Sequence, residues 1–177
     1  MKADIGLKIQ KGVTYALIII AIITFILGLG FMTDYYQLFY DGSQDMFNYY
    51  KDLQVLNKVI FQSTVAFIVL SFLLLAFDIH KKKAGVLGWL FVLGFSVYMI
   101  TNSLTIVSAI PSYQQAYLAF DFSIIENYSI STMSFSMSRV LFTALTGLAV
   151  ILLSVVTVNS IKKIKASKGS MGGTYGA

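Results

Sequence analysis

Several residue types that build active sites and rigid loops are scarce in this sequence. The 177 residues include no cysteine, one histidine and one proline, and charged residues make up only 12% of the chain. Without cysteine the chain has no disulfide, no thiolate nucleophile and no cysteine-ligated metal. A soluble domain carries about 25% charged residues, roughly twice the share found here. These absences exclude a disulfide-stapled domain and disfavour a soluble fold.

Charge is missing altogether from four stretches, residues 12–33, 59–77, 84–110 and 140–161. An α-helix crosses a hydrocarbon core of about 30 Å with about 20 apolar residues, and each stretch meets or approaches that length. Hydrophobic residues form 57% of the chain, and its mean hydropathy is +0.77. The sequence therefore predicts an all-α integral membrane protein, a four-transmembrane-helix bundle.

The rest of the chain leaves room for little besides this bundle. We expect residues 1–168 to form a single four-span membrane domain. Residues 169–177 are rich in glycine and are predicted to be disordered. The link between the second and third stretches is very short, which predicts an antiparallel hairpin. We therefore expect these two helices to be the closest neighbours in the fold.

Basic residues gather in three short segments that four spans place on one side of the membrane. Ten of the thirteen lie there: Lys2, Lys8, Lys11, Lys81, Lys82, Lys83, Lys162, Lys163, Lys165 and Lys168. With Asp4 and Asp78, these segments carry a net charge of +8, against −3 on the other side. Short segments rich in Lys and Arg usually stay on the cytoplasmic side of a membrane, which predicts that both termini are cytoplasmic. The basic charge then marks topology and contacts anionic lipid headgroups, and a nucleic-acid site is not expected.

Small residues recur within the predicted spans at spacings that place them on one helix face. Lipid offers no hydrophobic drive for helix association, so such residues favour close packing between helices. We interpret the following set as helix-packing positions, with a dedicated dimer face as the alternative: Gly28, Ala84, Gly88, Gly94, Thr143 and Gly147.

Two outer loops connect the spans, over residues 34–57 and 111–138. Pro111, the only proline, is expected to close the third span, since the residue before a proline disfavours helix. Long loops are often functional. Residues 129–138 alternate polar and apolar side chains, which fits either a strand or the first turns of the fourth helix.

Aromatic residues are dense in the first loop, where they fit either a binding surface or the interfacial belt of a membrane protein. Apolar residues of the second loop next to the membrane suggest docking on lipid or on a partner. The candidate partner-binding residues are Tyr35, Tyr36, Tyr40, Phe47, Tyr49, Tyr50, Met133, Phe135 and Met137.

Nothing in the sequence assembles a recognisable active site. No predicted span has a central ionisable residue, the usual mark of an ion path. His80 stands beside three lysines, and residues 41–45 lack the glycine and glutamate positions of a calcium loop. We therefore expect no enzyme, no catalytic residue, no cofactor and no metal site. Asn127 begins a glycosylation acceptor pattern that matters only in a eukaryotic cell.

The four-span plan with both ends inside is similar to that of tetraspanins, claudin-like proteins and MARVEL-type proteins. Tetraspanins carry a Cys-Cys-Gly motif and loop disulfides, and claudin-like proteins carry two cysteines in the first outer loop. A chain without cysteine supplies neither. No function is transferred from topology alone.

These observations favour a non-enzymatic membrane protein, an accessory, assembly or scaffold subunit. It would bind another membrane protein through its helix faces and outer loops, in the plasma (cytoplasmic) membrane. The alternative is a small channel or transporter built from several copies, with a pore lined by Ser, Thr, Asn and Gln. The expected partners are the lipid bilayer and either another membrane protein or a second copy of the chain.

Overall fold

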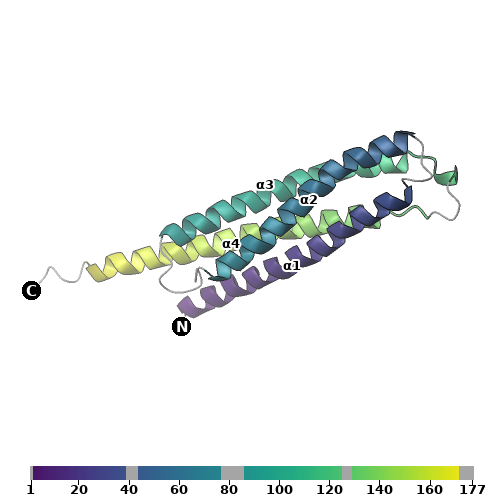
Figure 1. The fold of residues 1–177 in the computed structure, drawn as a ribbon. Helices are drawn as coiled ribbons and strands as arrows, with labels where there is room; N and C mark the ends of the chain where they lie inside the picture. Colours follow the sequence, from purple (N-terminus) through teal and green to yellow (C-terminus); the bar gives the residue numbers. More distant parts are fainter. Residues whose placement is uncertain (1, 39–43, 77–85, 125–128, 172–177) are drawn as a thin grey trace, which may run out of the picture.

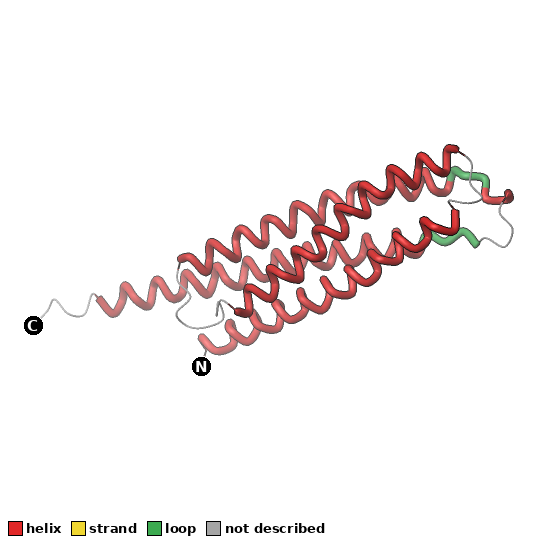
Figure 2. The backbone as a smooth tube through the Cα atoms, in the orientation of Figure 1, coloured by secondary structure: helices red, strands yellow, loops and turns green. Residues whose placement is uncertain are grey.

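Four long helices make up nearly all of the computed structural model (Figure 1), which describes residues 2–38, 44–76, 86–124 and 129–171, with side chains at 5–28, 44–76, 86–123 and 129–162. They are α1 (Lys2–Leu38), α2 (Gln44–Ala76), α3 (Val86–Leu118) and α4 (Met133–Met171), with a short 3₁₀ helix η1 (Phe122–Ile124) before α4. The described residues contain no strand (Figure 2). All four helices are long and apolar enough to cross a membrane, as the charge-free stretches predict.

The helices form a ring in which each packs against its neighbours in sequence and α4 closes against α1. Among the described residues, the diagonal pairs α1 with α3 and α2 with α4 make no close approach. α1 begins and α4 ends at the same end of the bundle (Figure 1). We call this the basic end, after its exposed lysines Lys8, Lys11 and Lys162.

Aromatic rings mark the contacts on either side of α2. Phe25 of α1 and Phe61 of α2 have ring centroids 5.5 Å apart. Phe67 of α2 meets Tyr98 of α3 edge-on at 5.9 Å. Edge-on ring pairs add about 0.5–1.5 kcal/mol to the burial of their area. These pairs help to fix how far each helix is shifted along its neighbour.

Polar contacts mark the two seams of α4. The indole nitrogen of Trp89 on α3 donates to the Thr157 hydroxyl at 3.0 Å. The side-chain nitrogen of Asn159 donates to the Gln10 side-chain oxygen on α1 at 3.2 Å. In apolar surroundings a polar side chain without a partner is costly. Such pairs therefore specify which helices meet and in which register.

Both the inside and the outside of the bundle are apolar. Leu17, Phe67, Met99, Phe142 and Leu145 are fully buried along the axis. The outward faces also carry large aliphatic residues, with exposed isoleucines on α1 and exposed valines on α2 and α4. A helix that is hydrophobic all round suits a membrane span.

The hairpin of α2 and α3 is not the tightest pair, contrary to the prediction. α3 and α4 approach each other most extensively, and α2 and α3 least. A short link fixes only the distance between two helix ends, whereas the separation of the axes depends on side chains. The rings of Phe67 and Tyr98 lie between α2 and α3 and keep them apart.

Pro111 does not close the third helix, and the outer segments are mostly helical instead of being loops. α3 continues to Leu118, because Ile106 and Ile110 before the proline and Tyr117 after it are buried. Proline removes one helical hydrogen bond, and this buried packing on both sides keeps the chain helical. α2 already begins at Gln44, so residues 44–57 are helix as well.

The start of α4 decides between the two interpretations of residues 129–138. The backbone nitrogen of Met133 donates to the Ser131 hydroxyl at 3.3 Å, and that of Ser136 donates to the Thr132 carbonyl at 3.1 Å. The Thr132 carbonyl thus accepts the first helical bond and the Ser131 hydroxyl accepts from the first amide of α4, and the strand interpretation is wrong. At the other end α4 runs to Met171, so the first residues of the predicted disordered tail are helical. Residues 172–177 lie outside the described part.

Replacing Phe67 by alanine should destabilise the bundle strongly. Its side chain is fully buried, whereas that of Phe72 on the same helix is 51% exposed. We expect F67A to lower the free energy of unfolding by about 3–5 kcal/mol, measured by titration with a denaturing detergent. F72A is the matched control and should cost much less. Equal losses would contradict the assignment of these two faces.

Candidate functional site

Tyr49 is the centre of an aromatic cluster at the end of the bundle opposite the basic end. Its ring lies 5.1 Å from that of Tyr50, 6.4 Å from Tyr113, 6.3 Å from Tyr117 and 5.3 Å from Phe120, measured between centroids. The cluster therefore joins the first turns of α2 to the last turns of α3. We call this end of the molecule the aromatic end.

The cluster continues from α3 to η1 and α4. The Tyr117 ring is 5.0 Å from that of Phe122 and 5.8 Å from that of Phe135, and Phe120 is 6.3 Å from Phe122. Three helices and η1 are thus tied together outside the charge-free stretches. The aromatic end is a small packed core of its own, beyond the four spans predicted from the sequence.

Hydrogen bonds from two tyrosines cross the α2–α3 seam in opposite directions. The Tyr49 hydroxyl donates to the Tyr113 carbonyl at 3.0 Å. The Tyr113 hydroxyl donates to the Asp52 carbonyl at 3.4 Å. A buried tyrosine usually needs such a partner for its hydroxyl. The pair therefore both satisfies these groups and holds the two helix ends in register.

A carboxylate organises the turn that follows α3. The hydroxyl and the backbone amide of Ser123 donate to Asp121 and hold the pKa of its carboxyl below the ordinary value; the amide lies 2.9 Å from the carboxylate. The contribution to stability is present above the ordinary pKa and is lost as the pH falls through the lowered one. Asp121 is exposed, so it orders this turn without acting as a buried charge.

The predicted partner-binding residues divide into a buried and an exposed group. Tyr49, Tyr50 and Phe135 are buried in the aromatic cluster. Phe47, Met133 and Met137 are exposed, Met133 by 65%. The backbones of Tyr35 and Tyr36 lie in α1, with their side chains outside the described part, as is all of Tyr40. A role in partner binding stays a prediction for the whole set.

The structure adds apolar residues to the exposed group. Val55, Leu118 and Ile130 are each more than half exposed and lie outside the charge-free stretches. Large apolar side chains that gather beyond the spans suit contact with a partner. The sequence prediction does not single out Val55 and Leu118, because it treats residues 34–57 and 111–138 as loops. Helical periodicity extended back to Gln44 in α2 and past Pro111 in α3 places them within helices.

Only some of the predicted helix-packing residues pack inside this bundle. A Cβ at Gly28 would lie 3.1 Å from the Ile60 methyl, so α1 and α2 approach closely there. A Cβ at Gly94 or Gly147 would meet nothing within 4 Å. These two glycines face away from the bundle. Any packing that they mediate is with another molecule.

The other members of that set contribute less. Thr143 is exposed, and its hydroxyl donates to the Arg139 carbonyl of its own helix at 2.7 Å. Gly88 is half-buried, and Ala84 lies outside the described part. Sequence reasoning missed Gly6, where a Cβ would overlap with the side-chain oxygen of Asn159. Because Gly6 stands alone among larger residues, no spacing pattern marks it.

The outward face of α3 differs from those of α1 and α2. Four of its hydroxyl residues, at spacings of four, three and four, are exposed: Thr101, Thr105, Ser108 and Ser112. Gly94 lies seven residues before Thr101 on the same face and is also exposed. By contrast, exposed isoleucines cover α1 and exposed valines and aromatics cover α2. We call these five residues the hydroxyl face.

Each hydroxyl on this face donates to a carbonyl of its own helix. Thr101 donates to the Val97 carbonyl at 2.9 Å, Thr105 to that of Thr101 at 2.9 Å, and Ser108 to that of Thr105 at 2.9 Å. Ser112 donates to the Ala109 carbonyl at 2.7 Å. The polar groups are thus satisfied locally, and the small hydroxyl residues stand beside the exposed Val97 and Leu104.

The bundle interior also contains hydroxyls. Ser63 donates to the Asn102 side-chain oxygen at 3.4 Å. Ser71, Ser96 and Ser103 are fully buried, and their hydroxyls have no hydrogen-bond partner among the described residues. The described part of the chain holds no group of three or more His, Cys, Asp or Glu side chains able to bind a metal ion.

Comparison of the chain with protein-family models, with curated proteins and with solved structures finds no match. The function is therefore argued from the hydroxyl face and the aromatic end alone.

The Tyr49 ring should contribute far more to stability than its hydroxyl. We expect Y49F to lose about 0.5–1.5 kcal/mol, the usual net value of one hydrogen bond. Y49A should lose about 3–5 kcal/mol, as for other buried rings. Unfolding in denaturing detergent measures both. F47A, which removes a partly exposed ring two residues earlier on the same helix, is the control. A loss in F47A as large as in Y49A would contradict a cluster centred on Tyr49.

Proposed function

We propose that this protein is a non-enzymatic accessory, assembly or scaffold subunit that binds another membrane protein. The hydroxyl face of α3 carries the proposal. It would recognise a transmembrane helix of the partner, and exposed apolar residues at the aromatic end would contact the part of the partner outside the membrane.

The chemistry of the hydroxyl face supports this proposal over simple exposure to lipid. Helix interfaces in membranes are enriched in Gly, Ala, Ser and Thr, because small side chains let two backbones approach closely. Lipid-facing surfaces need only apolar side chains, as on α1 and α2. One face of α3 combines Gly94 with four small or branched hydroxyl residues, and no helix of the described bundle covers it.

The aromatic end supports the same proposal from outside the spans. Its buried rings hold the ends of α2, α3 and α4 together, so the exposed Phe47, Leu118 and Met133 stand on a rigid base. A rigid surface loses little conformational entropy on binding. A partner would then meet an ordered surface continuous with α3.

A second function, a small homo-oligomeric channel or transporter, draws on the same face. Thr101, Thr105 and Ser108 from several copies would line a polar path. The seven-residue spacing from Gly94 to Thr101 and from Thr101 to Ser108 suits a helix pair that repeats around an axis. We rank it second because the described spans hold no central ionisable residue, which ion paths usually contain.

The remaining features of the proposal concern placement in the cell. Lysines at the basic end favour cytoplasmic termini and contact with anionic headgroups, in the plasma membrane. The aromatic end would then lie outside the cell. No cluster of titratable groups among the described residues suggests a reaction to catalyse.

Mutation of the hydroxyl face tests the proposal directly. Tagged protein extracted from its own membranes in mild detergent should carry a stoichiometric foreign chain, identified by mass spectrometry. S108W and T101W should each reduce that chain about tenfold or more, the change that about 1.4 kcal/mol of lost packing represents. The bulky indole prevents the approach of a second helix without disturbing the bundle, because both positions face outward.

Val69→Trp is the control, since Val69 is 52% exposed on the aliphatic face of α2. It should leave the foreign chain bound. Equal retention in S108W and V69W would contradict the assignment to α3. A homo-oligomer free of foreign chains, dispersed by S108W, would instead favour the channel, and ion flux in liposomes would then be measured.

A further inference from the structure

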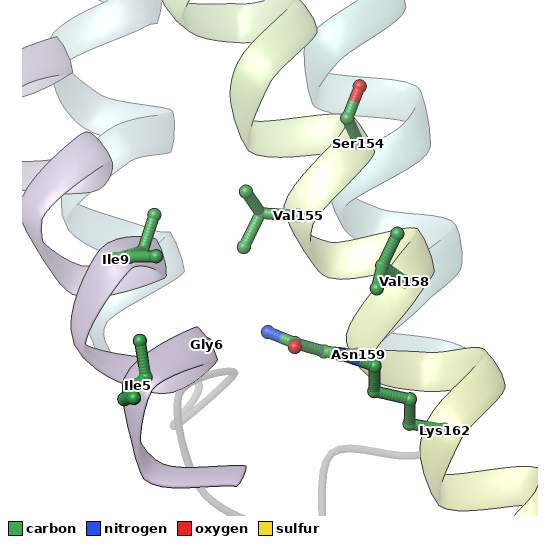
Figure 3. Close-up of a pocket in the computed structure, with 8 residues that line it drawn as sticks. All are labelled: Ile5, Gly6, Ile9, Ser154, Val155, Val158, Asn159 and Lys162. Carbon is green, nitrogen blue, oxygen red and sulfur yellow. The ribbon is translucent and has the colours of Figure 1, made fainter. Parts of the chain in front are cut away.

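A crevice of about 450 Å³ opens between α1 and α4 at the basic end (Figure 3). Sites for small molecules usually measure about 300–1,000 Å³. From α1 it is lined by Ile5, Gly6 and Ile9, and from α4 by Ser154, Val155, Val158, Asn159 and Lys162. Ile5, Ile9 and Val158 are about half exposed. The crevice therefore opens sideways, toward whatever surrounds the bundle.

One polar contact forms the floor of the crevice. Asn159 points from α4 toward α1 in Figure 3, and its side-chain nitrogen lies 3.2 Å from the Gln10 side-chain oxygen. Gln10 is 2% exposed. A Cβ at Gly6 would overlap with the Asn159 side-chain oxygen, so only glycine admits this side chain. A buried amide pair is costly unless it is satisfied, which fixes the distance between α1 and α4 here.

The lining of the crevice is mostly apolar and carries a positive charge at one end. Ile5, Ile9, Val155 and Val158 make it mostly apolar, and the Ser154 hydroxyl already donates to the Val150 carbonyl at 2.8 Å. Among the described residues that line it, the Lys162 ammonium is the one ionisable group. Positive charge thus stands at the end of an apolar slot.

We propose that this crevice binds one anionic phospholipid. An acyl chain would lie against the isoleucines and valines, and the phosphate would meet Lys162 at the level of the headgroups. Charge complementarity selects this occupant, because a zwitterionic lipid would fill the same slot without a net charge to offset that of Lys162. A partner helix is disfavoured, because the isoleucine and valine side chains leave no flat stripe of small residues.

This site is independent of the proposed function, because it lies at the opposite end of the bundle from the aromatic cluster and away from α3. A bound lipid would seal the α1–α4 seam, the one that closes the ring of helices. The lipid would then be a structural component of the bundle, selected by its headgroup.

Retention of lipid by the purified protein tests the proposal. The full chain is placed in bilayers of equal parts phosphatidylglycerol and phosphatidylcholine, and lipids that remain bound are identified by native mass spectrometry. We expect one lipid per chain, with phosphatidylglycerol preferred. K162Q should reduce that preference about fivefold, since each basic residue near a membrane surface contributes about 1 kcal/mol.

Two matched controls separate headgroup from acyl chain. K58Q removes an exposed lysine from α2, far from the crevice, and should leave the preference unchanged. V155F fills the crevice and should reduce binding of both lipids, whereas V150F, on the exposed face of the same helix, should not. A K162Q variant that matches K58Q, or a V155F variant that retains as much lipid as V150F, would overturn the proposal.

Discussion

The structure depends on one constraint: in apolar surroundings, a polar group that lacks a partner within the protein is costly. The backbone meets this constraint by forming four long helices, because a helix satisfies its own amides and carbonyls. Many side-chain hydroxyls follow the same rule, although those of Ser71, Ser96 and Ser103 have no partner among the described residues. Thr14 and Thr24 on α1 and Thr64 on α2 all donate to carbonyls one turn earlier. Polar contacts between helices are therefore few, and each one specifies a seam.

Those few contacts explain the order of the helices better than apolar burial does. Hydrophobic side chains cover the inside and the outside alike, so burial alone does not say which faces should meet. Trp89 with Thr157 and Gln10 with Asn159 tie α4 to both of its neighbours. Tyr49 and Tyr113 tie α2 to α3 beyond the spans. Along the ring, polar contacts thus mark the α1–α4, α3–α4 and α2–α3 seams.

The spans were predictable from the sequence and the helix ends were not. Each charge-free stretch lies largely within one helix, because hydropathy reports which residues suit the bilayer. Lys58 and Arg139 each stand just before a charge-free stretch. Even so, α2 includes Lys58 and α4 includes Arg139, because a charge at the membrane surface does not interrupt a helix. The prediction that Pro111 closes the third span was wrong for a related reason. The local preference of a proline against helix is weaker than the stabilisation from burying Ile106, Ile110 and Tyr117 around it.

The candidate surfaces were harder to predict, because they depend on which face of each helix is turned outward. Tyr49 and Phe47 have similar sequence surroundings, but one is in a core and the other is exposed. The same holds for Gly28 and Gly94, of which only Gly28 lies close to a neighbouring helix.

The hydroxyl face of α3 has a consequence for the energetics of partner binding. Because its hydroxyls are satisfied within α3, exposure to lipid costs little. The protein would therefore be stable alone, and the proposed partner would gain affinity from close packing without having to replace missing hydrogen bonds.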